Sequence, residues 1–171
     1  MIARHKGLIT LLLSLTLAAA TARAGAGPSN FRPDMQIKKA AEPNYTGDGV
    51  YLPTLQSKSA RLARGKMIAF GLRAENDGTI LDDYYLKGCS SSKGFIVTYF
   101  HEGMNITTTM TGSVGHNTDG LESGDTFDLV MRIKVKKNAD SGKKKICKVV
   151  APSVSGPSEV RDAVVGKVTV K

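Results

Sequence analysis

The chain has 171 residues, a formal net charge of +9, 41% hydrophobic residues and two cysteines. This length suits one domain rather than two, and no stretch after the first residues is long and apolar enough to cross a bilayer. The positive charge favours attraction to anionic polymers or cell surfaces but selects no particular partner.

The chain starts with the features of a secretory signal peptide. Arg4 and Lys6 precede a mostly apolar run over residues 7–22, which is too short for a transmembrane helix, and Ala22 and Ala24 form an A-x-A cleavage site. We therefore predict that residues 1–24 are removed, which leaves 171 − 24 = 147 residues with a charge of 9 − 3 = +6. The protein is expected to be secreted or periplasmic.

The remaining chain alternates short strand patterns with turn residues. Residues 25–34, rich in Gly and Pro, are predicted to form a flexible lead, and the folded domain is predicted to span residues 35–171. Residues 66–76 predict a strand that ends in an Asn-Asp-Gly turn, and residues 81–88 predict a second strand on which Tyr84 and Leu86 share a face. The apolar face of the first strand consists of Ile68, Phe70, Leu72 and Ala74.

The second half continues this pattern. A hairpin with a tight break at Glu102-Gly103 is predicted within residues 94–112, and residues 126–137 alternate strictly between apolar and polar side chains. Period two then recurs in residues 143–153 and 163–171, and no long segment has convincing helical periodicity. The inward positions of these last strands are Phe127, Leu129, Met131, Ile133, Val135, Cys147, Val149, Ala151, Val164, Val168 and Val170. About seven short strands predict an all-β sandwich.

The cysteine pair predicts a cross-link. In an oxidising compartment an even number of cysteines indicates a disulfide, here Cys89 with Cys147. Closing a loop of about 58 residues contributes about 4 kcal/mol in the chain-entropy model. A reactive thiol is the alternative, but no C-x-x-C spacing and no partner base supports it.

Several motifs resemble one family of bacterial secreted proteins. PNYTGDGVY, LDDYYLKG with GFIVTYF, LESGDTFDLVMRIKV and APSVSGPSEVRDAVV are similar to the immunoglobulin-like, cell-adhesion-related repeats of large surface proteins. The resemblance implies an immunoglobulin-like antiparallel β-sandwich that acts as a non-enzymatic extracellular module for adhesion or spacing. Two departures are Phe95 at a position where the family often has Trp, and the added cysteine pair.

Catalytic and metal-binding patterns are missing or ambiguous. No G-x-S-x-G elbow occurs, and Asp82 and Asp83 are adjacent, so on a strand they would point to opposite faces. His101 and His116 lack the spacing of a zinc or copper site, so we expect no enzyme, no metal and no cofactor. Calcium at the oxygen-rich residues 45–49 or 116–128 is the weaker alternative to ordinary turn chemistry. The acidic and amide groups of the second stretch are Asn117, Asp119, Glu122, Asp125 and Asp128.

A group of lysines is the one surface feature above background. They are Lys134, Lys136, Lys137, Lys143, Lys144, Lys145 and Lys148, and all but Lys137 are assigned to one candidate anionic-ligand surface. Solvent-facing lysines that block strand aggregation explain them as well. The expected partner is an extracellular protein or a cell-surface polysaccharide, not nucleic acid, because no aromatics interleave with these lysines. The alternative is a carbohydrate-binding module that uses exposed aromatics such as Tyr51 and either Tyr84 or Tyr85.

Overall fold

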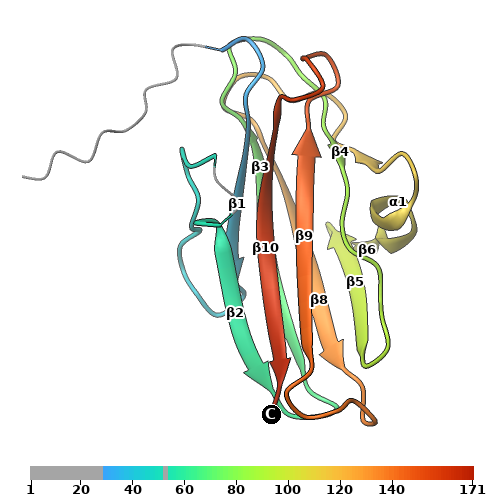
Figure 1. The fold of residues 1–171 in the computed structure, drawn as a ribbon. Coiled ribbons are helices and arrows are strands. Elements are labelled where there is room, and N and C mark those ends of the chain that lie inside the picture. Colours follow the sequence, from blue (N-terminus) through green and yellow to red (C-terminus); the bar gives the residue numbers. More distant parts are fainter. Residues whose placement is uncertain (1–28, 52–53) are drawn as a thin grey trace, which may run out of the picture.

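The computed structural model describes residues 29–51 and 54–171, and these form two β-sheets stacked face to face (Figure 1). The predicted signal peptide, with its cleavage site at Ala22 and Ala24, lies outside the described residues. Within the described part, no helix is long and apolar enough to cross a membrane.

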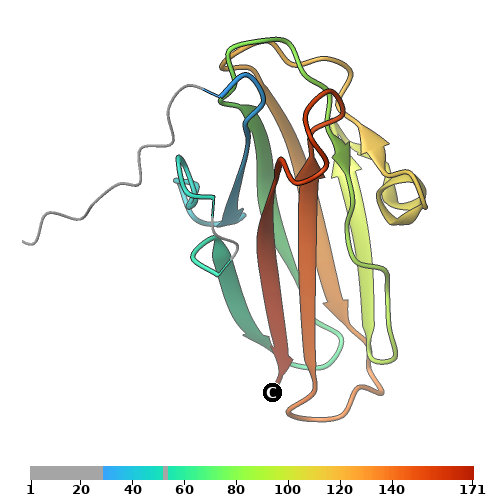
Figure 2. The same cartoon turned by 45° about the horizontal axis from the view of Figure 1, so that its top comes forward.

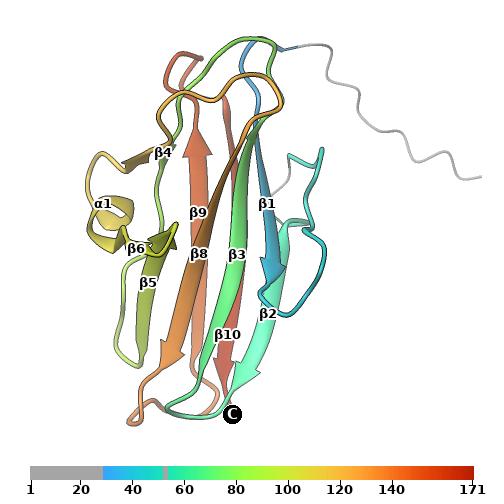
Figure 3. The same ribbon diagram turned by 180° about the vertical axis from the view of Figure 1, so that it is seen from behind.

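The larger sheet has five strands and is seen most fully from behind in Figure 3. All its neighbours pair antiparallel. In spatial order the strands are β1 (Pro33–Lys39), β3 (Met67–Asn76), β8 (Thr126–Val135), β5 (Phe95–His101) and β6 (Met104–Asn105).

The smaller sheet has three strands, β2 (Ser57–Leu62), β10 (Arg161–Val170) and β9 (Lys144–Pro152), in that order. β9 pairs antiparallel with β10, whereas β2 pairs parallel with it. A two-stranded pair, β4 (Tyr85–Leu86) with β7 (His116–Asn117), and the short helix α1 (Thr107–Thr111) lie at the side of the sandwich, as Figure 2 shows with the top tilted forward.

The architecture is the predicted all-β, immunoglobulin-like sandwich. Seven of the described strands have six or more residues, which matches the predicted number, and the pairing within the larger sheet is antiparallel as expected. Among the strands of residues 29–51 and 54–171, the parallel contact of β2 with β10 is the one departure from a fully antiparallel arrangement.

The core lies between the two sheets, and the alternation of the sequence accounts for it. The apolar positions of β8, from Phe127 to Val135, are buried, while Asp128, Arg132 and Lys134 between them are exposed. Cys147, Val149 and Ala151 of β9 face inward as predicted, and so do Val164, Val168 and Val170 of β10. Period-two patterning therefore predicted the inner faces of both sheets.

The local differences from the predictions have physical causes. β1 begins at Pro33, two residues before the predicted start of the domain. The predicted strand over residues 81–88 is reduced to Tyr85–Leu86 because this segment changes partners, with isolated bridges from Asp82 to Leu121, from Tyr84 to Ser153 and from Lys87 to Val150. The predicted hairpin with its turn at Glu102-Gly103 is formed by β5 and β6, whereas strand β2, helix α1 and the short strand β7 had no clear signal in the sequence.

Candidate functional site

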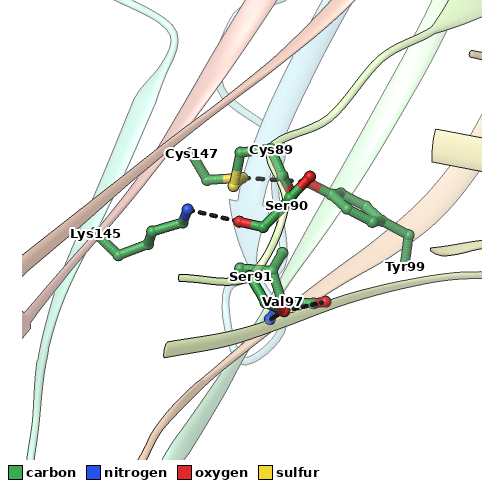
Figure 4. The surroundings of a disulfide bond; sticks show 7 residues. All are labelled: Cys89, Ser90, Ser91, Val97, Tyr99, Lys145 and Cys147. Atoms are coloured by element: carbon green, nitrogen blue, oxygen red, sulfur yellow. Dashed lines mark hydrogen bonds between the residues drawn. A yellow bond between two sulfur atoms is a disulfide. The ribbon is translucent and has the colours of Figure 1, made fainter. Parts of the chain in front are cut away.

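The predicted disulfide between Cys89 and Cys147 is present and joins the segment between β4 and β5 to strand β9 (Figure 4). The Cα atoms are 5.2 Å apart, and Cys147 is fully buried. The hydroxyl of Tyr99 donates to the carbonyl oxygen of Cys89 at 3.0 Å, and burial raises the pKa of this phenol. Because no free cysteine exists in the described part of the chain, a reactive thiol is not supported.

The predicted lysine surface is divided between two faces of the molecule. Lys134 points outward from β8 in the larger sheet, whereas Lys144 and Lys148 point outward from β9 in the smaller sheet, on the opposite side. Lys145 donates to the carbonyl oxygen of Ser90 at 2.6 Å, and burial lowers its pKa. Lys143 pairs with Asp140, and Lys136 follows β8 in the loop to β9. Lys134 therefore lies on a different face from Lys144 and Lys148, and a shared surface of all six lysines stays a prediction.

A groove of about 650 Å³ crosses the outer face of the larger sheet instead. Its floor includes Gly71 of β3 and Val130 of β8, which are register partners. A Cβ atom on Gly71 would lie 3.3 Å from side-chain carbons of Lys38 and from the hydroxyl oxygen of Tyr45. The missing side chain at Gly71 therefore lets Lys38 and Tyr45 lean over the sheet.

Tyr45 and Lys38 form one wall of this groove. The ammonium nitrogen of Lys38 lies 4.5 Å from the centroid of the Tyr45 ring, and the guanidinium carbon of Arg73 lies 4.7 Å from it. Arg73 also donates two hydrogen bonds of 2.8 Å to the carboxylate of Asp128, and this bidentate pair raises the pKa of Arg73. Burial, with a contribution from Asp128, raises the pKa of the Tyr45 phenol, which therefore stays neutral.

Phe100 and Arg132 form the opposite wall. The guanidinium carbon of Arg132 lies 4.3 Å from the centroid of the Phe100 ring. His101, next in the chain, is held by stacking on Phe127 with the ring centroids 3.9 Å apart and by a 2.7 Å contact of its Nδ1 with the carbonyl oxygen of Asp128. Cation–π attraction thus positions a cation over an aromatic ring on each side of the groove.

The remaining candidates from the sequence serve turns or are buried. The carboxylate of Asp125 accepts from the amide of Glu122 at 3.1 Å, as expected of turn chemistry. Asp82 accepts from the hydroxyl of Ser153, whereas Asp83 accepts from the amide of Gly120. The two carboxylates therefore have different partners and do not work as a pair, as predicted. His116 contacts the Thr109 hydroxyl through its Nδ1 at 3.0 Å.

Of the aromatic residues considered for a carbohydrate-binding platform, Tyr85 is half-buried and lies outside the groove. Tyr84 is fully buried, and the half-buried Tyr51 donates a 2.6 Å hydrogen bond to Asp77. Tyr45 and Phe100 line the groove in their place. Phe100 had a signal in the sequence, because Val97 and Tyr99 point inward and a strand then directs the next residue outward. Tyr45 precedes the Thr46 bridge to β1 and had no such signal.

Comparisons with known proteins support no more than a likeness of fold. No protein-family model and no curated protein sequence matches the chain. Among solved structures it is similar to a family 123 glycoside hydrolase from Clostridium perfringens (10% identity, TM-score 0.48), of which it spans only 27% while 80% of this chain is covered. It is also similar to a PapD-like domain of human CEP192 (12% identity, TM-score 0.41, coverage of 98% and 96%). A third is the CooA pilin subunit of enterotoxigenic Escherichia coli (10% identity, TM-score 0.38, coverage of 81% and 99%).

No function follows from likenesses at this level. The β-sandwich fold is evident from the chain's own sheets, whereas the finer resemblance to bacterial cell-adhesion-related repeats remains an expectation from the sequence motifs.

Proposed function

We propose that this chain is a secreted, non-enzymatic binding module and that the groove on the larger sheet binds an acidic saccharide of an extracellular surface. The observation that carries the proposal is the pair of cations, Lys38 and Arg132, held over the rings of Tyr45 and Phe100 in one groove. The intrachain disulfide favours an oxidising compartment, in agreement with the predicted signal peptide.

The charge of the groove favours an anionic group in the ligand. Asp128 is already neutralised by Arg73, whereas neither Lys38 nor Arg132 has an ion pair within the described residues. Each of these two cations also covers one face of its aromatic ring, so the groove offers less bare ring surface for a neutral sugar. A carboxylate or sulfate could form charge-assisted hydrogen bonds to them.

The shape and the remaining polar groups favour a saccharide over a peptide or a nucleic acid. A peptide that binds by adding a strand to a sheet needs a free strand edge, whereas this groove lies on a sheet face. Carboxylates of Glu102 and Asp128 line the same groove, where they can accept hydrogen bonds from sugar hydroxyls. The charge of Glu102, which has no ion pair within the described residues, would repel a continuous phosphate backbone.

A glycan array with acidic glycans and their neutral counterparts tests the proposal, with single-stranded oligonucleotides included as competitors. We expect binding to glycans that carry uronic, sialic or sulfate groups and a loss of signal between 50 and 300 mM salt, conditions chosen because exposed charges are screened in this range. Binding only to oligonucleotides, or to no probe, would overturn it; the second result would favour a purely structural spacer.

Two matched double variants locate the binding surface. Lys38→Gln with Arg132→Gln removes two groove cations, whereas Lys144→Gln with Lys148→Gln removes two cations from the opposite sheet. We expect the first pair to weaken binding of the best acidic glycan about tenfold or more, the effect of losing about 1.4 kcal/mol, and the second pair to leave it unchanged. Equal losses in both would assign binding to net charge rather than to the groove.

A further inference from the structure

A second site lies beside the groove, where three carboxylates converge. Asp34 of β1, Asp48 of the loop that follows β1 and Glu75 of β3 each offer an oxygen, and these atoms lie within 4.8 Å of one another. Asp34 and Glu75 are register partners on adjacent strands, and the loop folds back over them. Gly47 and Gly49, with φ values of 120° and 64°, allow the loop to bend there.

The carboxyl group of Asp34 is not fully satisfied by its protein neighbours. Asp34 is 0% exposed, and its Oδ2 accepts from the side-chain amide of Gln36 at 3.1 Å and from the backbone amide of Gly49 at 3.2 Å. Its Oδ1 has no hydrogen-bond partner among the described residues. Buried polar atoms of folded proteins almost always have a partner, so this oxygen indicates a ligand.

The charges at this position are also unbalanced. Asp34, Asp48 and Glu75 make no ion pair within the described residues. Ionised carboxylates this close together repel one another. A bound cation would compensate this repulsion.

We propose that Asp34, Asp48 and Glu75 bind a calcium ion. Two oxygens on one calcium ion, at about 2.3–2.6 Å each, lie at most about 4.6–5.2 Å apart, so the separation of these carboxylates is compatible with a shared ion. The donors are all oxygens, the type that calcium prefers, and nitrogen or sulfur ligands are not part of the cluster. A surface depression lined by Gln36 and Asp48 offers an entry path.

The site is linked to the groove through the chain. The loop that follows β1 carries both Tyr45, a wall of the groove, and Asp48, and between them Thr46 pairs with Ile37 of β1. Calcium would therefore fix the loop and, with it, the position of the Tyr45 ring. The calcium proposal does not depend on what the groove binds.

Thermal unfolding and calorimetric titration of the EDTA-treated protein with CaCl₂ at pH 7.5 test the site, with MgCl₂ and NaCl at matched ionic strength as controls. Extracellular calcium-binding modules bind calcium with dissociation constants of about 0.1–1 mM. We therefore expect 10 mM CaCl₂ to raise the midpoint temperature of thermal unfolding by about 5 °C. No calcium-specific rise, or an equal rise with MgCl₂, would overturn the assignment.

Three variants separate binding from general effects of charge. Asp48→Asn alters an exposed ligand and should fold normally but lose the calcium-dependent rise, whereas Asp140→Asn, in the loop between β8 and β9, should retain it. Asp34→Asn should raise the calcium-free midpoint, because it removes a buried charge, and should abolish the response to calcium. A wild-type response in Asp48→Asn would refute the site.

Discussion

The side-chain amide of Gln56 and the carboxylate of Asp162 meet at 2.7 Å on the outer edge of β1. Between them they satisfy both backbone groups of Met35: Asp162 accepts from its N–H at 2.7 Å, and Gln56 donates to its carbonyl oxygen at 2.7 Å. Two side chains thus replace a neighbouring strand at this point and tie the edge of the larger sheet to the smaller one.

This arrangement predicts that Gln56→Ala destabilises the fold by about 2–3 kcal/mol, because it leaves the buried carbonyl oxygen of Met35 without its side-chain donor and removes one of the donors to Asp162. Urea denaturation measures the change in the free energy of unfolding. The conservative change Asp162→Asn keeps an acceptor and should cost less. A cost below 0.5 kcal/mol for Gln56→Ala would contradict this role.

The disulfide predicts a second stability change. Replacing Cys89 and Cys147 together by alanine should lower the free energy of unfolding by about 4 kcal/mol, since the unfolded chain regains the freedom of a loop with a sequence separation of 58 residues. Denaturant titration under non-reducing conditions compares the variant with the wild type. Equal midpoints would show that the cross-link adds nothing to stability.

Gly166 of β10 predicts an effect of close packing between the sheets. A Cβ atom on this residue would lie 2.5 Å from the terminal methyl carbon of Met131 on β8. Gly166→Ala should therefore cost about 1–3 kcal/mol, as overpacked cores do. In the Gly166→Ala background, Met131→Ala should cost less than it does alone, because the same methyl group no longer has to move. Additive costs in this double-mutant cycle would contradict the contact.

His116 predicts a dependence of stability on pH. Burial lowers its pKa, and His101 lowers it further against the opposing effect of Asp119. The unfolded chain then binds more protons than the folded one, so this contribution to stability is complete above the unfolded value of about 6.5 and is lost as pH falls below it. We expect the free energy of unfolding to fall more between pH 7.5 and 5.5 in the wild type than in His116→Gln. If the free energy of unfolding falls equally in both proteins, His116 does not cause the pH dependence.

Much of the fold was predictable from local pattern. The alternation of apolar and polar residues in 126–137 and 143–153 identified the inner faces of β8 and β9. Residues 1–24 predicted an oxidising compartment, and this compartment in turn predicted that the two cysteines form a disulfide. Strand β2 was missed because its sequence, SKSARL, is mostly polar and its burial only partial, so no apolar face marks it.

The groove and the acidic cluster were harder to predict because both depend on register across strands. Gly71 meets Val130 only once β3 and β8 are aligned, and Asp34 meets Glu75 only once β1 and β3 are. The sequence indicated oxygen donors at residues 45–49, but their carboxylate partners come from two strands that are distant in the chain. Lys134 points away from Lys144 and Lys148 because β8 and β9, although close in sequence, belong to opposite sheets.

The position of the disulfide has a mechanical consequence. If the domain is stretched by its two ends, the chain between Cys89 and Cys147 cannot extend even after every strand has separated, since the covalent bond carries the load past it. With 58 residues in that interval and about 3.4 Å gained per extended residue, about 200 Å of contour length stays hidden from the force. A domain tethered at both ends would then lengthen far less on failure than its residue count suggests.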